Sequence, residues 1–320
     1  MRYAQAMQEP DALKMATVTL KDMARGGIYD HIGGGFSRYS TDEKWLVPHF
    51  EKMLYDNALL LIAYVIAYQY TKEESFADVA HRIADYILRE LTDEQGGFYC
   101  GQDADSEGVE GKYYVFTSEE VKTVLGETDG AEFCRLYDIT DSGNFEGKSI
   151  PNRINARKEG WDCEDLRLQK LYDYPLHRTQ LHKDDKILLS WNGRTIIALA
   201  KAGQALGEKR YLDGAIKAHK FIRKEMTDEH DRLYLRWRDG EAANAGQLDD
   251  YAVYTLAFLE LYRVTFDTGY LQEAVCRAEQ MTDLFEDKER GGYFKTAADS
   301  EQLIARPKET YDGAIPSAIA

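Results

Sequence analysis

Two kinds of helical segment alternate along the chain. Segments such as residues 56–69 and 250–264, the latter including Leu256, are apolar on nearly every side, which predicts helices that are buried all round. Segments such as residues 75–91 and 271–286 carry one apolar stripe at helical spacing, which predicts outer helices with one face in water. In the second of these the stripe is Leu271, Ala274, Val275, Ala278, Met281 and Phe285. This alternation favours an all-α fold with an inner ring of helices wrapped by an outer ring. A linear solenoid of helix pairs is the alternative, but it would leave the inner helices wetter than their composition tolerates.

A repeat of nearly constant spacing supports this fold. Each of three copies runs from a polar residue, through an apolar helix and a striped helix, to an Asp that precedes an aromatic residue. The three positions are Asp56, Asp93 and Phe98; Asn192, Asp228 and Tyr234; and Asp250, Asp287 and Tyr293. The intervals from the first position are 36–37 and 42–43 residues in every copy. Such agreement indicates a repeated helix pair, with a short β-hairpin where one pair joins the next.

The expected fold is therefore an (α/α)6-type toroid of antiparallel helix hairpins. We expect residues 1–320 to form it as a single domain that is incomplete at both ends. Residues 9–25 read as an outer helix with no inner partner before it, and YDGAIPSAIA, from Tyr311, looks like the head of another inner helix. Residues 111–184 are predicted to form a degenerate fourth hairpin, with a strand and a short helix in KYYVFTSEEVKTVLG and another helix in AEFCRLYDI.

Charge and composition exclude several classes of partner. The net charge is −16 and the basic residues are scattered, so neither nucleic acid nor an acidic membrane surface is an expected partner. The longest apolar run has 11 residues, fewer than the roughly 20 of a membrane-spanning helix. The first residues lack the features of a secretory signal, which favours the cytoplasm. We expect isolated buried thiols and neither metal nor cofactor, because no zinc-like spacing joins the four cysteines, Cys100, Cys134, Cys163 and Cys276.

Polar and aromatic residues precede each inner helix. In a toroid these helix heads converge on the mouth of one cavity, so distant parts of the sequence are expected to share a pocket. Aromatic rings beside carboxylates and amides suit a sugar, whose ring faces stack while its hydroxyls form hydrogen bonds. The predicted substrate-binding residues are Arg38, Tyr39, Trp45, Glu51, Lys52, Tyr55, Asp56, Trp191, Asn192, Asp249, Tyr251, Tyr311 and Asp312. The alternative for Asp56, Asn192, Asp250 and Asp312 is that each only caps a helix.

Two chemistries can be built from these groups. In a sugar epimerase or isomerase, a histidine moves a proton beside a carbonyl, and His31 and His49 are the candidates. In a glycosidase, two carboxylates flank the bond, and Asp103, Asp105, Asp249 and Asp250 are the candidates. For each histidine, the alternative is a hydrogen-bonded structural residue. The predicted catalytic residues are accordingly His31, His49, Asp103, Asp105 and Asp250.

Several segments of the chain closely resemble the spermatogenesis-associated, thioredoxin-linked protein family of bacteria and animals. They are GGIYDHIGGGFSRYSTDEKWLVPHFEKMLYDNALL, QDADSEGVEGKYYVFT, NFEGKSIPN, LLSWNGRTIIALAKAG, LDDYAVYTLAFLELY and YDGAIPS. The resemblance implies a toroid like those of N-acylglucosamine 2-epimerases and six-hairpin glycosidases, which in the family follows a thioredoxin-like domain that is absent here. The chain departs from the family at its end, reading PSAIA where the family tends to run PSGNS. The resemblance assigns no catalytic residue.

We therefore expect a carbohydrate-active enzyme of the toroid type that uses histidine as acid and base, in the manner of a sugar epimerase or isomerase. A glycoside hydrolase with paired carboxylates is one alternative. A non-catalytic module of a redox-linked protein, which binds a ligand or another protein, is the other. The expected partner is a small sugar-like molecule, and the sequence leaves the oligomeric state open.

Overall fold

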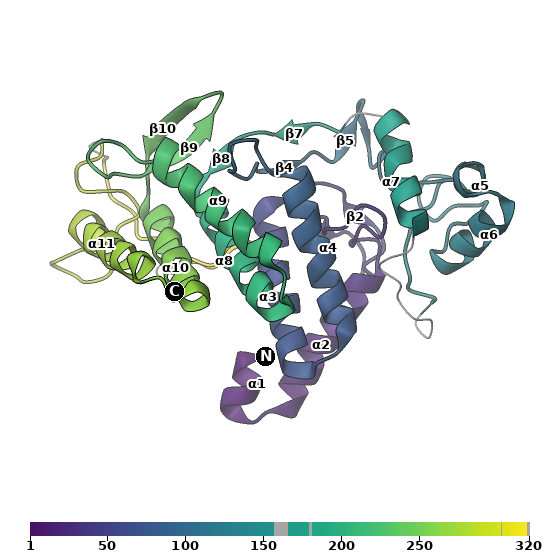
Figure 1. Cartoon of the computed structure of the whole chain (residues 1–320), viewed down its shortest axis with the longest axis horizontal. Coiled ribbons are helices and arrows are strands. Elements are labelled where there is room, and N and C mark those ends of the chain that lie inside the picture. The colour runs from purple at the N-terminus through teal and green to yellow at the C-terminus, as the bar shows by residue number, and fades with distance from the viewer. Residues whose placement is uncertain (157–165, 179–180, 302, 319–320) are drawn as a thin grey trace. The chain divides into compact units, whose positions relative to one another are not determined.

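The computed structural model describes residues 1–320 except 157–165, 179–180, 302 and 319–320. Helices predominate, and the strands are short antiparallel pairs (Figure 1). The chain forms two compact units that are interleaved in sequence. The first comprises Met1–Met53, Ala63–Arg89 and Gly101–Asp184, and the second comprises Leu54–Ile62, Glu90–Cys100 and Asp185–Ala320.

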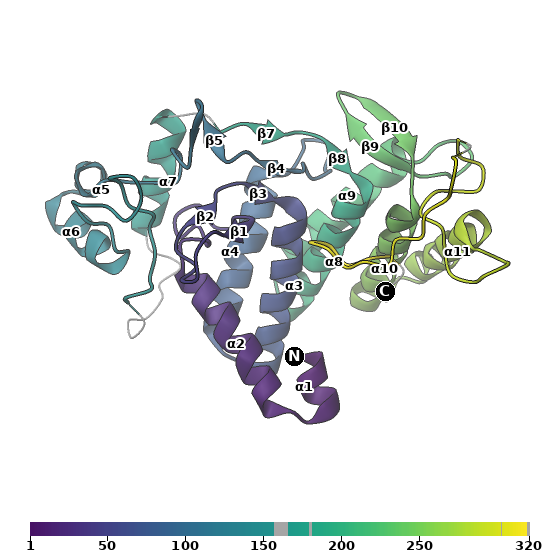
Figure 2. The ribbon, with the colours of Figure 1, turned by 180° about the vertical axis from the view of Figure 1, so that it is seen from behind.

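The first unit contains most of the short strands. Its helices are α1 (Arg2–Met7), α2 (Pro10–Arg25), most of α4 (Glu74–Glu90), α5 (Ser118–Leu125), α6 (Glu127–Leu136) and α7 (Leu166–Arg178), with the second half of α3 (Leu54–Thr71). Its strands are β1 (Tyr39–Ser40), β2 (Pro48–His49), β3 (Lys52–Met53), β4 (Gly101–Gln102), β5 (Asp105–Ser106), β6 (Val109–Glu110) and β7 (Lys183–Asp184). They pair as β1–β2, β5–β6 and β3–β4–β7. Figure 2 shows β1 and β2 above the upper end of α2.

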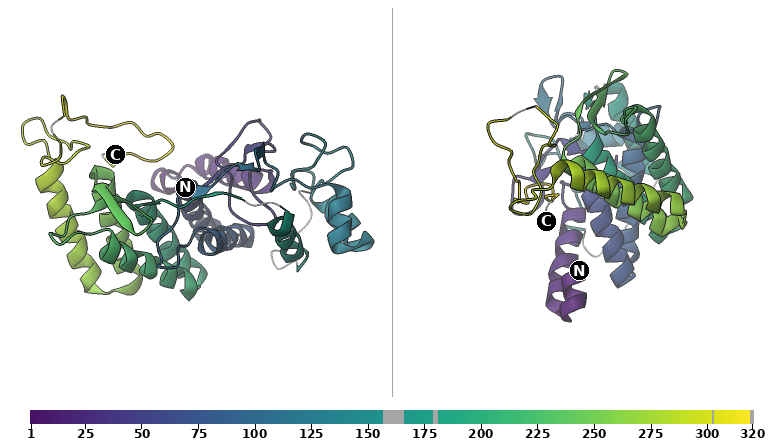
Figure 3. Two further views of the ribbon diagram at one scale, coloured as in Figure 1. Left: turned by 90° about the horizontal axis from the view of Figure 1, so that it is seen from above. Right: turned by 90° about the vertical axis from the view of Figure 1, so that its left-hand side faces the viewer.

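The second unit contains two complete helix pairs and one sheet. The pairs are α8 (Leu189–Leu206) with α9 (Lys209–Glu225), and α10 (Leu248–Thr265) with α11 (Thr268–Phe285). α8 packs against both α9 and α10, and α11 packs against α10 at one edge of the unit (Figure 3). The sheet contains β8 (Ile187–Leu188), β9 (Tyr234–Arg238) and β10 (Glu241–Ala245) in that order. The predicted helix pairs are confirmed.

One kind of turn recurs where helix pairs join, and it explains the repeated Asp. In each copy the carboxylate accepts hydrogen bonds from backbone N–H groups two to four residues further along, and an antiparallel bridge closes the turn. An Asp side chain that mimics a backbone turn in this way stabilises a reversal of the chain. The four turns are those of Asp30, Asp93, Asp228 and Asp287. The predicted short hairpins at the junctions are confirmed.

Burial of the helices follows the predicted period but not always the predicted phase. α8 is buried on nearly every side, whereas Leu256 of α10 is 55% exposed. In α11 the predicted core positions Ala274 and Phe285 are buried, whereas Val275 is 52% exposed and Arg277, outside the predicted stripe, is buried. The Arg277 side chain is held inward by its hydrogen bonds, a contact that apolar spacing does not indicate.

Two other expectations need correction. The strand predicted in KYYVF is reduced to one bridge between Phe116 and Ser149, while the two helices predicted after it are α5 and α6. α5 begins with a capping box in which Thr117 and Glu120 each bond the other's backbone N–H, and α7 packs beside α5 as well. The residues from Tyr311 to Ala318 form no helix, since the Asp312 carboxylate accepts the Ser317 N–H (2.8 Å) in a loop.

The remaining sequence expectations concern thiols, metals and membranes. Cys100 and Cys134 are buried free thiols, Cys276 is half-buried, and Cys163 lies outside the described residues. In the part of the chain that the structure describes, no three His, Cys, Asp or Glu side chains gather where they could hold a metal ion. No described helix combines the length and the apolar character needed to cross a bilayer.

Candidate functional site

A pocket of about 220 Å³ lies at the heads of α8 and α10 in the second unit. We call it the Trp191 pocket. Trp191 and Arg194 come from the first turns of α8, and Asp249 comes from the first turn of α10. The segment after α11 supplies the other side of the pocket, including Lys295, Glu309, Tyr311, Pro316 and Ser317. Three of the predicted substrate-binding residues, Trp191, Asp249 and Tyr311, therefore line one pocket.

Contacts with neighbouring residues fix the positions of the aromatic and cationic side chains of the Trp191 pocket. The Trp191 ring packs edge-on against the buried Tyr55 ring, with centroids 4.7 Å apart. Arg194 donates to the backbone carbonyls of Ser190 (3.2 Å) and Pro316 (3.1 Å). Burial lowers the pKa of Arg194, whereas the neighbouring aspartates act in the opposite direction. The guanidinium nevertheless stays charged, because its ordinary pKa is far above neutral.

The two aspartates at the head of α10 differ in availability. Asp249 is half-buried in the pocket wall and accepts no hydrogen bond from any described residue. Asp250 is only 2% exposed, and its two oxygens accept the backbone N–H groups of Ser190 (3.0 Å) and Gln247 (2.8 Å). Burial raises the pKa of Asp250 to about 7, while these two N–H groups oppose the shift. Asp249 can therefore meet a ligand, whereas Asp250 joins α10 to the head of α8.

Asn192 and Tyr251, two further residues predicted to bind substrate, instead form buried hydrogen bonds at the starts of α8 and α10. Asn192 is fully buried; its Oδ1 accepts the Phe98 N–H (2.8 Å) and its Nδ2 donates to the carbonyls of Phe98 and Leu188 (both 2.9 Å). The buried Tyr251 hydroxyl accepts the Leu233 N–H at 3.1 Å. Asp56 lies half-buried in the first turn of α3. Tyr311 is 80% exposed at the pocket rim, and Asp312 is exposed beside it.

A second group of predicted residues meets in the first unit. The β1–β2 register sets Tyr39 opposite His49, and their rings stack with centroids 5.1 Å apart. His49 Nδ1 lies 2.8 Å from Glu110 Oε1, and the His49 side chain is 29% exposed. Arg38 pairs with Glu51 at 3.1 Å. We call these five residues the His49 cluster.

Sequence reasoning missed Glu110 and Arg194. Glu110 belongs to QDADSEGVEG, where the turn at Glu107 and Gly108 pairs it with Asp105 across β5 and β6. That turn signal could have placed Glu110 on a hairpin, but not beside His49. Arg194 follows Trp191 by three residues on one helix, a spacing that puts both side chains on one face. That signal was available in SWNGR.

The predicted carboxylates Asp103 and Asp105 lie at the surface of the first unit. Both are exposed. The backbone N–H of Asp103 donates to the His182 carbonyl (2.9 Å), and the Asp105 N–H approaches Asp103 Oδ1 at 3.4 Å. Trp45 lies in the turn between β1 and β2 with a positive φ of 62°, and its carbonyl accepts the Ile28 N–H (3.1 Å).

Lys52 and His31 are buried in the first unit. Lys52 Nζ donates to Asp30 Oδ2 (2.7 Å) and to the Gly34 carbonyl (2.8 Å). Burial raises the pKa of Asp30. The Lys52 charge and the hydrogen bonds to the Asp30 carboxylate together lower it by more, so the pKa of Asp30 is below its ordinary value. His31 Nε2 lies 3.1 Å from the Gly26 carbonyl. Burial lowers the pKa of His31 to about 3, while this hydrogen bond opposes the shift, so the ring is neutral at neutral pH.

Comparison with known proteins identifies the chain's relatives. No protein-family model matches it. Human spermatogenesis-associated protein 20 is 36% identical over 353 aligned residues, which cover 96% of this chain and 45% of the human protein. The mouse protein of the same name gives the same identity and coverage. The chain is a homologue of spermatogenesis-associated protein 20. It spans less than half the length of these relatives.

Solved structures show the fold that this homologue of spermatogenesis-associated protein 20 adopts. Cellobiose 2-epimerase from Bacillus thermoamylovorans matches with a TM-score of 0.56 at 14% identity, covering 87% of this chain and 56% of that one. The unsaturated glucuronyl hydrolase of Bacillus sp. GL1 also gives 0.56, at 12% identity, covering 92% and 63%. The chain thus has the mostly helical fold of (α/α)6 toroid structures. Sugar epimerases and glycoside hydrolases share that fold.

Proposed function

We propose that the protein is a carbohydrate-active enzyme that binds a sugar in the Trp191 pocket. The observation that carries this proposal is the combination on one pocket wall of an aromatic face, a charged donor and an available carboxylate, supplied by Trp191, Arg194 and Asp249. A sugar ring can stack on the indole while its hydroxyls donate to Asp249 and accept from Arg194. The volume of about 220 Å³ is below the roughly 300–1,000 Å³ of pockets for drug-sized ligands, which favours one sugar ring.

As a proposal separate from sugar binding in the Trp191 pocket, we propose epimerase- or isomerase-type chemistry at the His49 cluster, with His49 as the acid and base. This step requires a group that can take and return a proton and can reach a ligand, and a partly exposed histidine beside a carboxylate can do both. The His49 side chain is 29% exposed and Glu110 lies against its Nδ1. His31 supports the proposal less well, because its ring is buried and its pKa is lowered to about 3.

A glycoside hydrolase is the competing reaction. It needs two carboxyl groups that flank the scissile bond and remain open to the substrate and to water. At the head of α10 only Asp249 is available, because both oxygens of Asp250 accept backbone hydrogen bonds. The described contacts therefore favour proton transfer by histidine over hydrolysis by this carboxylate pair.

The test is proton exchange in deuterium oxide. The protein is incubated with a panel of reducing sugars, including N-acylhexosamines and uronic acids, and NMR follows deuterium entering the carbon next to the carbonyl. Epimerisation or isomerisation by proton transfer incorporates deuterium, whereas hydrolysis does not. We expect His49→Gln to lower kcat by about 10²- to 10⁴-fold. We expect Asp249→Asn to weaken sugar binding in the Trp191 pocket, raising Kd by about 10- to 100-fold, the value of a hydrogen bond to a charged group.

Two matched variants serve as controls for this test. His230→Gln and Asp239→Asn change exposed residues of the same types and are expected to leave both constants unchanged. Exchange that persists in both His49→Gln and His31→Ala would overturn the histidine assignment. Loss of turnover only in Asp103→Asn, with no deuterium incorporated, would favour the hydrolase. Sugar binding without any turnover would leave a non-catalytic binding module.

A further inference from the structure

The His49 imidazole is held from one side by a residue far away in sequence. His49 belongs to β2, and Glu110, 61 residues later, belongs to β6 of a separate hairpin. Nδ1 and Oε1 are 2.8 Å apart, a normal hydrogen-bond distance. Since a carboxylate only accepts hydrogen bonds, Nδ1 must be the donor in this contact.

The other ring nitrogen is differently placed. His49 Nε2 lies 3.7 Å from Glu51 Oε2, which is beyond hydrogen-bond range. That oxygen already accepts a hydrogen bond from Arg38 Nη1 at 3.1 Å, so the Glu51 charge is balanced by a cation. Nε2 makes no hydrogen bond with any described residue. Stacking on Tyr39 at 5.1 Å restrains the plane of the ring.

We infer that Glu110 is a positioning residue, which fixes His49 in the tautomer protonated at Nδ1 and leaves Nε2 to take and return the proton. Which nitrogen of a histidine carries the proton is set by the hydrogen bond that the other one makes. The proton transfer that Nε2 would carry out rests on the proposed function, whereas the tautomer set by Glu110 does not. The charged and titratable groups that face the ring are Glu110, Glu51, Arg38 and Tyr39, with Asp105 opposite Glu110 across β5 and β6.

The proton transfer balances without a further reactant. Nε2 takes the proton from the carbon next to the sugar carbonyl, and the electron pair of that C–H bond moves into an enediolate. The histidine becomes an imidazolium whose Nδ1–H still donates to Glu110. After the enediolate has turned about its bond to the rest of the sugar and presents its other face to Nε2, the same nitrogen returns the proton to that carbon. The carbonyl and the neutral imidazole are restored, and the product is the epimer.

The tautomer can be read directly by NMR on protein labelled at the histidine ring nitrogens. The His49 signal is assigned by its disappearance in His49→Gln, and the spectra are recorded in alkaline buffer. In the wild type we expect the one-bond proton coupling on Nδ1 and a bare Nε2. Glu110→Ala should shift the population towards the Nε2–H form. Glu107→Ala is the matched control, because Glu107 lies on the same hairpin and pairs with Lys112; it should leave the tautomer unchanged.

A kinetic measurement separates this inference from the proposed function. Glu110→Ala should lower kcat for deuterium exchange by about 10²-fold, at the lower end of the range for general acid–base catalysis, with little change in KM. A wild-type ring protonated at Nε2, or a tautomer indifferent to Glu110→Ala, would overturn the positioning role even if sugars are exchanged. A tautomer that responds to Glu110 while no sugar on the panel exchanges would support the positioning role and count against the proposed reaction.

Discussion

At the scale of the residue, the buried ion pair of Lys52 and Asp30 shows how a polar sequence signal can be structural. The Lys52 ammonium is 2.7 Å from the Asp30 carboxylate and also lies over the rings of Tyr86 (4.6 Å) and Tyr114 (4.9 Å). A buried charge that has lost its partner is costly, whereas the intact pair contributes little net stability. The pair therefore fixes the turn at Asp30 rather than adding to the free energy of unfolding.

This arrangement predicts the effect of removing one charge. Lys52→Met leaves the Asp30 carboxylate uncompensated and should lower the free energy of unfolding by about 3–5 kcal/mol, measured by urea denaturation. The double variant Lys52→Met/Asp30→Asn should lose less than Lys52→Met alone. Lys44→Met, which removes an exposed lysine, is the control and should be close to wild type. A double variant less stable than the single one would contradict this account.

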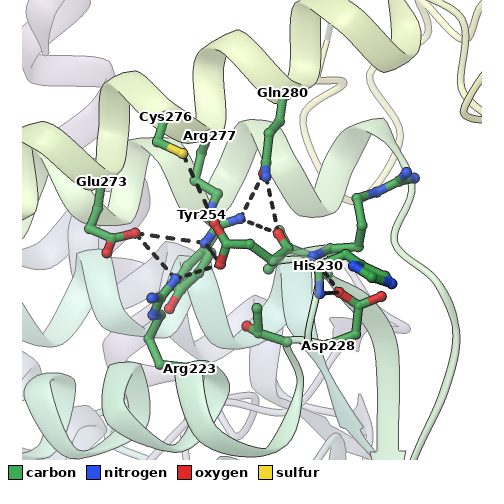
Figure 4. A network of polar contacts seen from close by, with 12 residues as sticks. Arg223, Asp228, His230, Tyr254, Glu273, Cys276, Arg277 and Gln280 are labelled. Carbon is green, nitrogen blue, oxygen red and sulfur yellow. Dashed lines mark hydrogen bonds and ion pairs between the residues drawn. The ribbon is translucent and has the colours of Figure 1, made fainter.

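At the scale of the element, a network of polar contacts joins Arg223 of α9 to Glu273 and Arg277 of α11 (Figure 4). Asp231, in the turn after α9, has a positive φ of 62°. The fully buried Arg277 of α11 donates to the Asp231 carbonyl and to its Oδ1, both at 2.6 Å. Arg223 of α9 bonds the same Oδ1 at 2.9 Å and approaches Glu273 of α11 at 3.3 Å. These bonds explain why α11 buries an arginine where its sequence offers Val275.

The contact between Arg277 and Asp231 depends on the planar guanidinium, which donates to two acceptors at once. Arg277→Lys keeps the charge but cannot reach both Asp231 acceptors, because an ammonium lacks the guanidinium geometry. We expect it to lower the free energy of unfolding by about 1.5–3 kcal/mol, the value of a hydrogen bond to a charged group. Arg263→Lys, which keeps the charge of a 64% exposed side chain beside Glu260, should change stability by less than about 0.5 kcal/mol. Equal effects in the two variants would show that the fork geometry is unimportant.

At the scale of the whole molecule, a buried and a half-buried histidine that stay neutral when folded make stability depend on pH. Burial lowers the pKa of His31 from 6.5 to about 3 and that of His219 from 6.5 to about 4. The unfolded chain therefore binds protons at these residues below about pH 6.5, where the folded protein does not. The contribution of these histidines to the free energy of unfolding is complete above that pH and is lost as the pH falls towards their folded-state pKa values.

The size of this effect can be measured for one histidine. Between about pH 6 and about pH 4, protonation of His31 in the unfolded chain should lower the free energy of unfolding by about 1.4 kcal/mol for each unit by which the pH falls. Urea denaturation of His31→Gln across this range should give a correspondingly shallower slope. His230→Gln, which changes an exposed histidine, should keep the wild-type slope. An unchanged slope in His31→Gln would mean that His31 takes up its proton in the folded state.

The sequence by itself determined the helix pairs and the turns between them. Apolar spacing and the recurrent Asp report on contacts within a helix face or a hairpin, which lie close in sequence and are repeated along the chain. It also placed Trp191, Asp249 and Tyr311 together, since all three were expected at the heads of inner helices. The burial of Arg277 in α11 escaped it because Arg277 is held inward by a residue of another hairpin.

Only the tertiary structure decided which polar residues are available to a ligand. Asn192 is bonded to Phe98, 94 residues away, and Asp250 to Ser190, 60 residues away, while Asp249 has no such partner among the described residues. His49 meets Glu110 by a side-chain contact between two separate hairpins. The physical reason is that a carboxylate or an imidazole has the same identity in the sequence whether its hydrogen bonds are satisfied or open, and distant backbone groups settle which it is.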